Sequence, residues 1–213
     1  KNDRHDLYTK DHWLWDGFDA ESYRDRLGVL GWYKNQTDYN KGCSFDELFR
    51  DPNAKPTPGN RLSKVPVFKQ CDPPWSSVSY DTGSVCSHGC GPSALAMVLA
   101  YYGHNTNPGK VAGEAMSVGG NCGGCGSNWG MFGRVAKLYG MGESDIGIDE
   151  ALKRLENGEP IIAATSLYGG HFIALGDKKG DTISVSGSAR SDPDAITEAK
   201  LRSIGSAYFY VHP

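Results

Sequence analysis

The sequence lacks any long apolar stretch. Its longest apolar run, residues 94–102, covers about half of the roughly 18 residues that a membrane-spanning helix needs. It also lacks internal repeats and low-complexity tracts, which argues against solenoids and fibrous proteins. Hydrophobic residues make up 38% and charged residues 22% of the chain, close to ordinary globular values. The sequence therefore predicts a globular protein without a membrane-spanning segment.

Clustered positive charge is missing as well. The 22 Lys and Arg residues face 25 Asp and Glu residues, which gives a net charge of -3, and no basic cluster is denser than the pair at 178–179. Nucleic acids and anionic membranes bind dense basic patches, so neither is expected as a partner. The chain begins at Lys1 without the basic and apolar regions of a signal peptide, so we expect a mature protein or an excised fragment.

Glycine and cysteine, by contrast, are concentrated in one region. The chain has 28 glycines, above the usual share of about 7%, and four of its 6 cysteines lie within residues 86–125. Several glycines lie in the same region: Gly89, Gly91, Gly119, Gly120, Gly123 and Gly124. The functional chemistry is therefore expected there.

Composition divides the chain near residue 60. Residues 1–60 form a polar and aromatic N-terminal extension, in which 19–27 and 44–50 have the Asp or Ser caps of short helices. The extension ends in a proline-rich linker at 51–60. A compact domain is therefore expected at residues 61–213.

The compact domain is expected to contain helices first and strands second. Residues 91–103 predict a helix that is apolar on nearly all sides and therefore lies at the centre of the domain. Further helices are predicted at 108–116, 129–139 and 149–156, and strands at 161–165, 171–175, 182–186 and 207–211. A hairpin connection is predicted at 176–181. This order predicts an α+β fold with an antiparallel sheet.

Cys90 is the candidate nucleophile because it lies at the start of the buried helix, between Gly89 and Gly91. Unpaired N–H groups and the positive end of the helix dipole favour a thiolate there. The two glycines leave room for a substrate carbonyl, and the Cys90 N–H can donate to an oxyanion. The alternative is a small buried residue at a helix cap, because free cysteine is often buried.

His171 is the candidate general base. It opens an apolar strand after the flexible pair at 169–170, where its side chain can reach a neighbouring helix terminus. A histidine in this position can take the thiol proton and later protonate a leaving amine. A lone histidine in such a strand is more often structural, but its combination with Cys90 favours catalysis.

Three sequence blocks resemble papain-like bacterial cysteine peptidases, especially those related to the bacteriocin-processing (double-glycine leader) peptidases. The blocks are residues 65–75, 89–99 and 170–175, and the resemblance spans about 65–211. It implies a papain-like α+β fold in which a central helix bearing the nucleophile packs against an antiparallel sheet bearing the histidine. It also implies an enzyme that needs no metal or organic cofactor.

By this resemblance Cys90 is the nucleophile, His171 is the general base, and Gln70 stabilises the oxyanion with its side-chain amide. The gap of nineteen residues between Gln70 and Cys90 is longer than in compact relatives. The insertion therefore has to loop out and return.

The substrate cleft is expected to be lined by Trp75, Gly89 and Gly170. Trp129 and Tyr168 also flank these motifs. Aromatic residues near a buried helix are more often part of the core, so packing is the alternative for all three aromatic side chains.

The third catalytic residue departs from the family pattern. Relatives place Asp or Asn in the strand after the histidine, in a Val-x-Asp-Pro-like stretch, and the matching position here is Gly187. Asp192, Ser186 or Ser188 can serve instead, as can a backbone carbonyl or a water molecule. The departure also leaves open a degraded site.

The other cysteines allow two interpretations. A zinc site is one, since four thiols and a histidine have suitable spacing: Cys86, Cys90, Cys122, Cys125 and His88. That site would occupy the proposed nucleophile. If Cys90 is free, the simplest arrangement is two disulfides, Cys71–Cys86 and Cys122–Cys125, with Cys43 left over. This pairing assumes an extracellular setting, which the resemblance to secreted hydrolases supports.

The sequence thus predicts a secreted, monomeric bacterial cysteine peptidase, located outside the cell or at the cell surface. Its partner is a peptide or cell-wall peptide, cleaved next to small residues such as Gly-Gly, because glycines line the approach to Cys90. A peptidoglycan endopeptidase or amidase is one alternative. The other is a non-catalytic binding or structural module with a degraded peptidase site or a four-cysteine zinc site.

Overall fold

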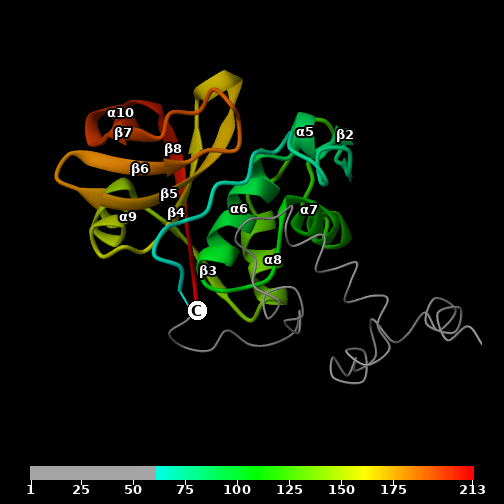
Figure 1. The fold of residues 1–213 in the computed structure, drawn as a ribbon, viewed down its shortest axis with the longest axis horizontal. Coiled ribbons are helices and arrows are strands. Elements are labelled where there is room, and N and C mark those ends of the chain that lie inside the picture. Colours follow the sequence, from blue (N-terminus) through cyan, green and yellow to red (C-terminus); the bar gives the residue numbers. More distant parts are fainter. Residues whose placement is uncertain (1–60) are drawn as a thin grey trace, which may run out of the picture. The chain divides into compact units, whose positions relative to one another are not determined.

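The computed structural model describes residues 61–213 (Figure 1). The helices and the linker predicted within residues 1–60, together with Cys43, lie outside the described residues. The domain boundary near residue 60 therefore stays a prediction. Within the described part, helices pack on an antiparallel sheet, so the predicted α+β class is confirmed.

The helices α5 to α8 form one layer around the predicted central helix. α5 (Val85–His88) leads into α6 (Cys90–Tyr101), and α7 (Pro108–Ser117) and α8 (Met131–Leu138) follow. α6 is buried from Gly91 to Leu99, because nearly every residue in it is apolar. α7 begins at Pro108 after Asn107, whose side chain accepts a hydrogen bond from the Lys110 N–H. None of the helices in residues 61–213 has the length and hydropathy needed to cross a bilayer.

The second layer, over residues 61–213, is a six-stranded antiparallel sheet with the strand order β3-β8-β4-β5-β6-β7. Its strands are β3 (Gly142–Ile146), β4 (Ile161–Thr165), β5 (His171–Lys179), β6 (Thr182–Ser186), β7 (Ala195–Thr197) and β8 (Gly205–His212). A short helix, η1 (Leu167–Gly169), connects β4 to β5. Two further strands, β1 (Ser79–Tyr80) and β2 (Gly83–Ser84), form a separate small hairpin.

Both faces of the sheet are covered by helices (Figure 1). Phe172 and Ala174 of β5 belong to the core shared with α6, α7 and α8. Ile173 and Leu175 belong to the core on the other face, which is shared with α9 (Ile148–Glu156) and α10 (Glu198–Ile204). Because helices cover both faces, every residue of β4 is buried. β5 packs directly against α6, which brings the predicted histidine strand to the predicted nucleophile helix.

The structure differs from the predicted elements where polar residues interrupt the pattern. β5 continues to Lys179, so the connection predicted at 176–181 shortens to a two-residue turn that contains Gly180 at φ 59°. An irregular register between Leu175 and Lys178 obscures the alternation in this half of the strand. The sequence analysis did not predict β3 and β7, because both are edge strands whose few buried positions leave no apolar pattern. It also did not predict α10, which is seven residues long.

Candidate active site

Cys90 is the first residue of α6, one residue before the predicted helix start. Gly89 occupies the N-cap position, and the unpaired first-turn N–H groups of the helix face this end. Among residues 61–213, Cys90 is the free cysteine, and it is half-buried. Its side chain therefore lies at the positive end of the dipole of a buried helix.

His171 opens β5, where its backbone pairs with Thr165 of β4, and only 7% of the residue is exposed. Its Nε2 lies 3.0 Å from Oδ2 of Asp192, and the ring also interacts electrostatically with Cys90. Because Asp192 engages Nε2, Nδ1 is the nitrogen left for the thiol. Burial favours the neutral ring, but the hydrogen bond with Asp192 and the interaction with Cys90 outweigh it and raise the pKa of His171 to about 9. The ring therefore carries a positive charge at neutral pH.

Asp192 is the predicted alternative that the structure brings to His171. Its side chain is fully buried, and Oδ2 also accepts a hydrogen bond from the Ala189 N–H at 2.8 Å. Burial acts to raise the pKa of Asp192, but the contact with His171, the Ala189 N–H and the charge of Lys69 together lower it. The sequence does carry a signal for this residue, since Asp192 and the proline after it form the Asp-Pro pair of the family pattern, five positions after Gly187.

The two serines proposed as alternatives to Asp192 have other partners. Ser186 donates to the Val65 carbonyl at 3.0 Å, and Ser188 donates to Oε1 of Gln70 at 2.9 Å. Each hydroxyl group therefore donates its proton to a group other than the His171 ring. The hydrogen bond of the His171 ring in this structure is made with Asp192, one of the three residues proposed.

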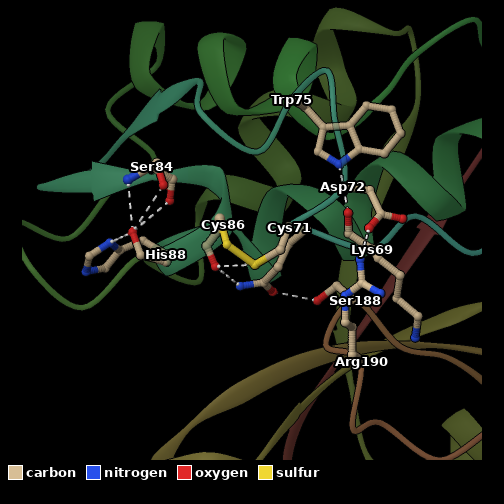
Figure 2. Close-up of a disulfide and its surroundings, with 11 residues drawn as sticks. Lys69, Cys71, Asp72, Trp75, Ser84, Cys86, His88, Ser188 and Arg190 are labelled. Atoms are coloured by element: carbon tan, nitrogen blue, oxygen red, sulfur yellow. Dashed lines mark hydrogen bonds and ion pairs between the residues drawn. A yellow bond between two sulfur atoms is a disulfide. The ribbon is translucent and has the colours of Figure 1, made fainter.

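Gln70 is held beside the helix that leads into Cys90. The insertion that follows Gln70 loops out and is closed by the Cys71–Cys86 disulfide, with 4.2 Å between the two Cα atoms (Figure 2). This confirms the predicted pairing. The Gln70 side chain donates through Nε2 to the Cys86 carbonyl at 2.7 Å and accepts from Ser188 through Oε1. The amide is therefore fixed at both ends, with one of its two N–H groups used by Cys86.

A second disulfide, Cys122–Cys125, confirms the other predicted pairing and lies in a glycine-rich loop. The carboxylate of Asp81, in the β1–β2 turn, binds this loop through four donors: Asn121 Nδ2 and the N–H groups of Gly123, Gly124 and Gly126. Desolvation acts against ionisation, but these hydrogen bonds lower the pKa of Asp81 to about 2. Sequence analysis missed Asp81, because nothing local links it to a loop some forty residues away.

The glycine-rich loop borders the first turn of α6. A Cβ added to Gly126 would lie 3.0 Å from the His88 carbonyl, and one added to Gly91 would clash with Ser127. Ser127 in turn shares a 2.6 Å hydrogen bond with the Tyr80 hydroxyl. Asp81 and its neighbour Tyr80 therefore both hold the loop against the helix end that carries Cys90.

The two glycines predicted to line the cleft have different surroundings. Gly170 precedes His171 at φ 132°, and no described atom lies within 4 Å of a Cβ added there, so the space beside it is open. A Cβ on Gly89 would clash with the backbone of Val85. Gly89 therefore allows α5 and α6 to pack closely.

Trp75 packs on the segment that carries Gln70. Its indole Nε1 donates to the Lys69 carbonyl at 2.8 Å, and its ring lies edge-on to Phe68 with centroids 5.7 Å apart. These contacts give Trp75 a role in holding this segment. Its predicted contact with substrate stays a prediction.

Tyr168 lies directly beside His171. Their ring centroids are 5.4 Å apart in an edge-to-face arrangement, and 58% of Tyr168 is exposed. Its backbone has φ 54°, in the left-handed region, and the next two residues, Gly169 and Gly170, also have positive φ. Trp129 is exposed as well, but its ring contacts Phe209. Tyr168 is therefore the exposed aromatic residue in contact with the candidate site.

The four-cysteine zinc arrangement is not formed. Cys86 is bonded to Cys71, and Cys122 is bonded to Cys125. Three of the four thiols proposed as zinc ligands are therefore tied up in disulfides. In residues 61–213, no group of three or more His, Cys, Asp or Glu side chains is placed to hold a metal ion.

Several solved structures are similar to this chain. The peptidase domain of Streptococcus ComA, a bi-functional ABC transporter involved in a quorum sensing pathway, is 16% identical over 60% of this chain and 93% of that chain, with a TM-score of 0.49. A double glycine motif protease from an AMS/PCAT transporter, in complex with its leader peptide, is 23% identical over 73% and 96%, with a TM-score of 0.47. A putative C39-like peptidase from Bacillus anthracis is 18% identical over 72% and 97%, with a TM-score of 0.48.

The family assignment rests on the sequence match. No curated protein matches the chain significantly. A family model described as "Peptidase_C39 like family" matches residues 62–204, about two thirds of the chain. The matched region includes Gln70, Cys90, His171 and Asp192. The chain therefore belongs to the peptidase C39-like family.

Proposed function

We propose that this chain is a secreted bacterial cysteine peptidase that hydrolyses peptide bonds through Cys90 and His171. The observation that carries the proposal is the row formed by Cys90, His171 and Asp192, in which His171 hydrogen-bonds with Asp192 and interacts electrostatically with Cys90. A protonated imidazole between a thiol and a carboxylate is suited to generating a thiolate nucleophile. Membership of a peptidase-like family supports the same class of reaction.

In the acylation step, the Cys90 thiolate attacks the carbonyl carbon of the substrate, and the C=O electron pair moves to the oxygen. The Cys90 N–H and the second N–H of the Gln70 amide stabilise this oxyanion. His171 donates its Nδ1 proton to the leaving amine as the C–N bond breaks. The first product leaves with its new N-terminus, and the acyl group stays on Cys90 as a thioester.

In the deacylation step, neutral His171 takes a proton from a water molecule that attacks the thioester carbonyl. The C–S bond breaks, and the carboxylic acid product leaves while the thiolate re-forms beside the imidazolium. Asp192 accepts from Nε2–H throughout, which holds the ring orientation and stabilises its positive charge. The ion pair is thus ready for the next substrate.

The proposed substrate is a peptide or cell-wall peptide with small residues, such as Gly-Gly, next to the scissile bond. Support comes from the open space at Gly170 directly before His171 and from the glycine-rich loop beside the first turn of α6. We place the enzyme outside the cell or at the bacterial cell surface, as a monomer. The two disulfides support an oxidising compartment.

The proposal is tested first without a substrate. Iodoacetamide at about pH 6 should alkylate Cys90 rapidly, since only thiolates react and ordinary thiols are protonated there. Peptide mass mapping identifies the modified residue, and Cys90→Ala supplies the blank. A slowly reacting Cys90 in wild-type protein would contradict the catalytic proposal.

Substrate class is then tested by cleavage profiling. Wild-type protein and Cys90→Ala are incubated with a peptide library and, separately, with purified sacculi. Cleavage next to small residues supports the proposed specificity, whereas a preference for bulky residues on both sides rejects it. Release of peptides from sacculi by the wild type alone identifies a cell-wall substrate.

A further inference from the structure

Two segments that are far apart in the sequence lie side by side (Figure 2). Residues 69–72 precede the insertion, and residues 187–190 follow β6. Their backbones are joined by a hydrogen bond of 3.0 Å from the Gln70 N–H to the Ser188 carbonyl. We call residues 69–72 and 187–190 the clasp.

Lys69 is the central side chain of the clasp. Its ammonium group donates to the Gly187 carbonyl at 2.8 Å and to the Ala189 carbonyl at 2.9 Å. The two acceptors flank Ser188, whose hydroxyl donates to the Gln70 amide. One part-buried ammonium group therefore holds the turn of backbone that presents Ser188 to Gln70.

The same turn of backbone holds Asp192. The Ala189 carbonyl accepts from Lys69, while the Ala189 N–H donates to Oδ2 of Asp192 at 2.8 Å. Asp192 Oδ2 in turn lies 3.0 Å from His171. A continuous row of hydrogen bonds thus runs from Lys69 through residue 189 and Asp192 to the ring of His171.

Lys69 also affects the buried carboxylate of Asp192 through its charge. Within the described residues, Oδ1 of Asp192 is buried and has no hydrogen-bond partner, so the ionised carboxylate relies on nearby positive charge. His171 supplies most of this charge, and Lys69 adds to it. The groups that act on the His171–Asp192 pair are thus Cys90 from α6, Lys69 from the clasp and the ring of Tyr168 from η1.

The outer end of the clasp is different. Arg190 and Asp72 form an ion pair of 2.7 Å, but 77% of the Arg190 side chain and 40% of the Asp72 side chain are exposed. Such exposed pairs contribute little to stability. The exposed pair therefore provides a comparison for Lys69 within the same clasp.

We propose that Lys69 is a positioning residue that holds Gln70 and Asp192 as one unit, so that the oxyanion donor and the histidine ring keep a fixed relation to Cys90. This inference rests on the proposed peptidase function. It assigns Lys69 no contact with substrate. Lys69 acts on the reaction through the carbonyl groups of residues 187 and 189.

The test uses the pH dependence of Cys90 alkylation, with iodoacetamide as the probe and the full chain as the protein. Lys69→Met removes the ammonium group, Lys69→Arg keeps the charge, and Lys64→Met removes an exposed lysine from the same stretch. When Asp192 moves away from His171, the imidazolium is less favoured. The pH at half-maximal alkylation should then rise by about one unit, and the rate at about pH 6 should fall about tenfold.

Lys69→Arg should lie nearer to the wild type, while Lys64→Met and Arg190→Ala should match it. A lower melting temperature with an unchanged pH profile would overturn the inference, because Lys69 would then only join two loops. A shift of the profile to lower pH would also overturn it, because the loss of a positive charge with Asp192 still in place favours the imidazolium. If Lys69→Met does not fold, Lys69→Gln, which retains one donor group, is judged by the same two criteria.

The wild-type profile separates this inference from the function on which it rests. If the wild type is alkylated rapidly near pH 6 and Lys69→Met has the same pH profile, the inference is wrong while the proposed function still holds. Slow wild-type alkylation at that pH removes both.

Discussion

The side chain of Asp192 occupies the space that any side chain at position 187 would need. A Cβ on Gly187 would clash with Cβ, Cγ and Oδ2 of Asp192. In the sequence, glycine at this position resembles the loss of a catalytic acid. In the structure, the glycine is what allows the acid from five residues later to reach His171 at 3.0 Å.

Gly187→Ala should therefore disable the site. The added methyl group pushes Asp192 away from the ring, and a displacement of about 1 Å at a catalytic group can reduce kcat/KM about 100-fold. Overpacking should also cost about 1–3 kcal/mol of unfolding free energy. Steady-state kinetics and denaturant unfolding measure the two effects.

Gly113→Ala is the matched control for this change. Gly113 lies inside α7, and no described atom is within 4 Å of a Cβ added there. The control should keep full activity and gain up to about 1 kcal/mol of stability, because alanine favours a helix over glycine. Full activity in Gly187→Ala would show that the ring does not depend on the observed position of Asp192.

The pKa of His171 predicts the alkaline limit of activity. The ring has to be protonated to release the amine, so kcat/KM should fall as the pH rises through about 9. Asp192→Asn removes a hydrogen bond that raises this pKa, so the fall should move to lower pH. The proton resonances of the His171 ring report the same midpoints by NMR.

The raised pKa of His171 also makes the stability of the fold depend on pH. The folded-state value of about 9 lies above the unfolded value, so the interactions of His171 stabilise the protein fully below about pH 6.5. This contribution is lost as the pH rises through the folded-state pKa.

Asp145→Asn, which removes an exposed acid on β3, is the control for Asp192→Asn. It should leave the midpoints of the kcat/KM profile and of the His171 NMR titration unchanged. An alkaline limit that is the same in Asp192→Asn and the wild type would contradict the assignment.

The Cys71–Cys86 disulfide should affect both stability and rate. It closes a loop with a sequence separation of 15, so the double variant Cys71→Ser/Cys86→Ser should lose about 3 kcal/mol of unfolding free energy. Because Gln70 is held by the Cys86 carbonyl, its amide should also become less well placed. We expect kcat to fall more than KM rises, since an oxyanion donor acts in the transition state.

Cys122→Ser/Cys125→Ser provides the comparison. That disulfide has a sequence separation of only 3, so its removal should lower the unfolding free energy by about half as much. Thermal melting and steady-state kinetics are measured for both double variants. If kcat is unchanged in the Cys71→Ser/Cys86→Ser protein, Gln70 is held in place without the disulfide.

Tyr168→Gly should separate stability from activity. Its φ of 54° is unfavourable for tyrosine, so glycine should relieve about 1 kcal/mol of backbone strain. Removing the exposed ring beside His171 should nevertheless raise KM several-fold, because the ring offers apolar contact to a bound peptide. Trp129→Ala removes an exposed ring that contacts Phe209 instead, and it should leave KM unchanged. A KM for Tyr168→Gly equal to that of the wild type would exclude Tyr168 from substrate binding.

The sequence was sufficient for the elements with strong local patterns. α6 and β4 were recognised because apolar residues are continuous in both, and α9 because its apolar residues recur at helical spacing. Polar edge strands such as β3 carry no such pattern, because pairing with β8 and not burial stabilises them. The two disulfide pairings were the simplest arrangement with Cys90 free in an extracellular setting, and both are present in the structure.

Within the candidate site, too, only some residues had a clear local signature in the sequence. Cys90 and His171 stand out in the sequence because a cysteine at a buried helix start and a histidine at a strand start each have a local signature. Asp192 was only one of three alternatives, although the Asp-Pro pair that begins at Asp192 is a local signal that Ser186 and Ser188 lack. The contact with His171 decides among them.

By itself, the sequence determined the family, the α+β class and the two residues that carry the proposed chemistry, because these depend on short motifs and on local periodicity. Only the tertiary structure decided which acid faces His171, how Lys69 joins residues 187 and 189, and how Asp81 holds the glycine-rich loop. These contacts join residues that are between 21 and 120 positions apart. Such contacts depend on how the helices and the sheet pack together, which no local pattern specifies.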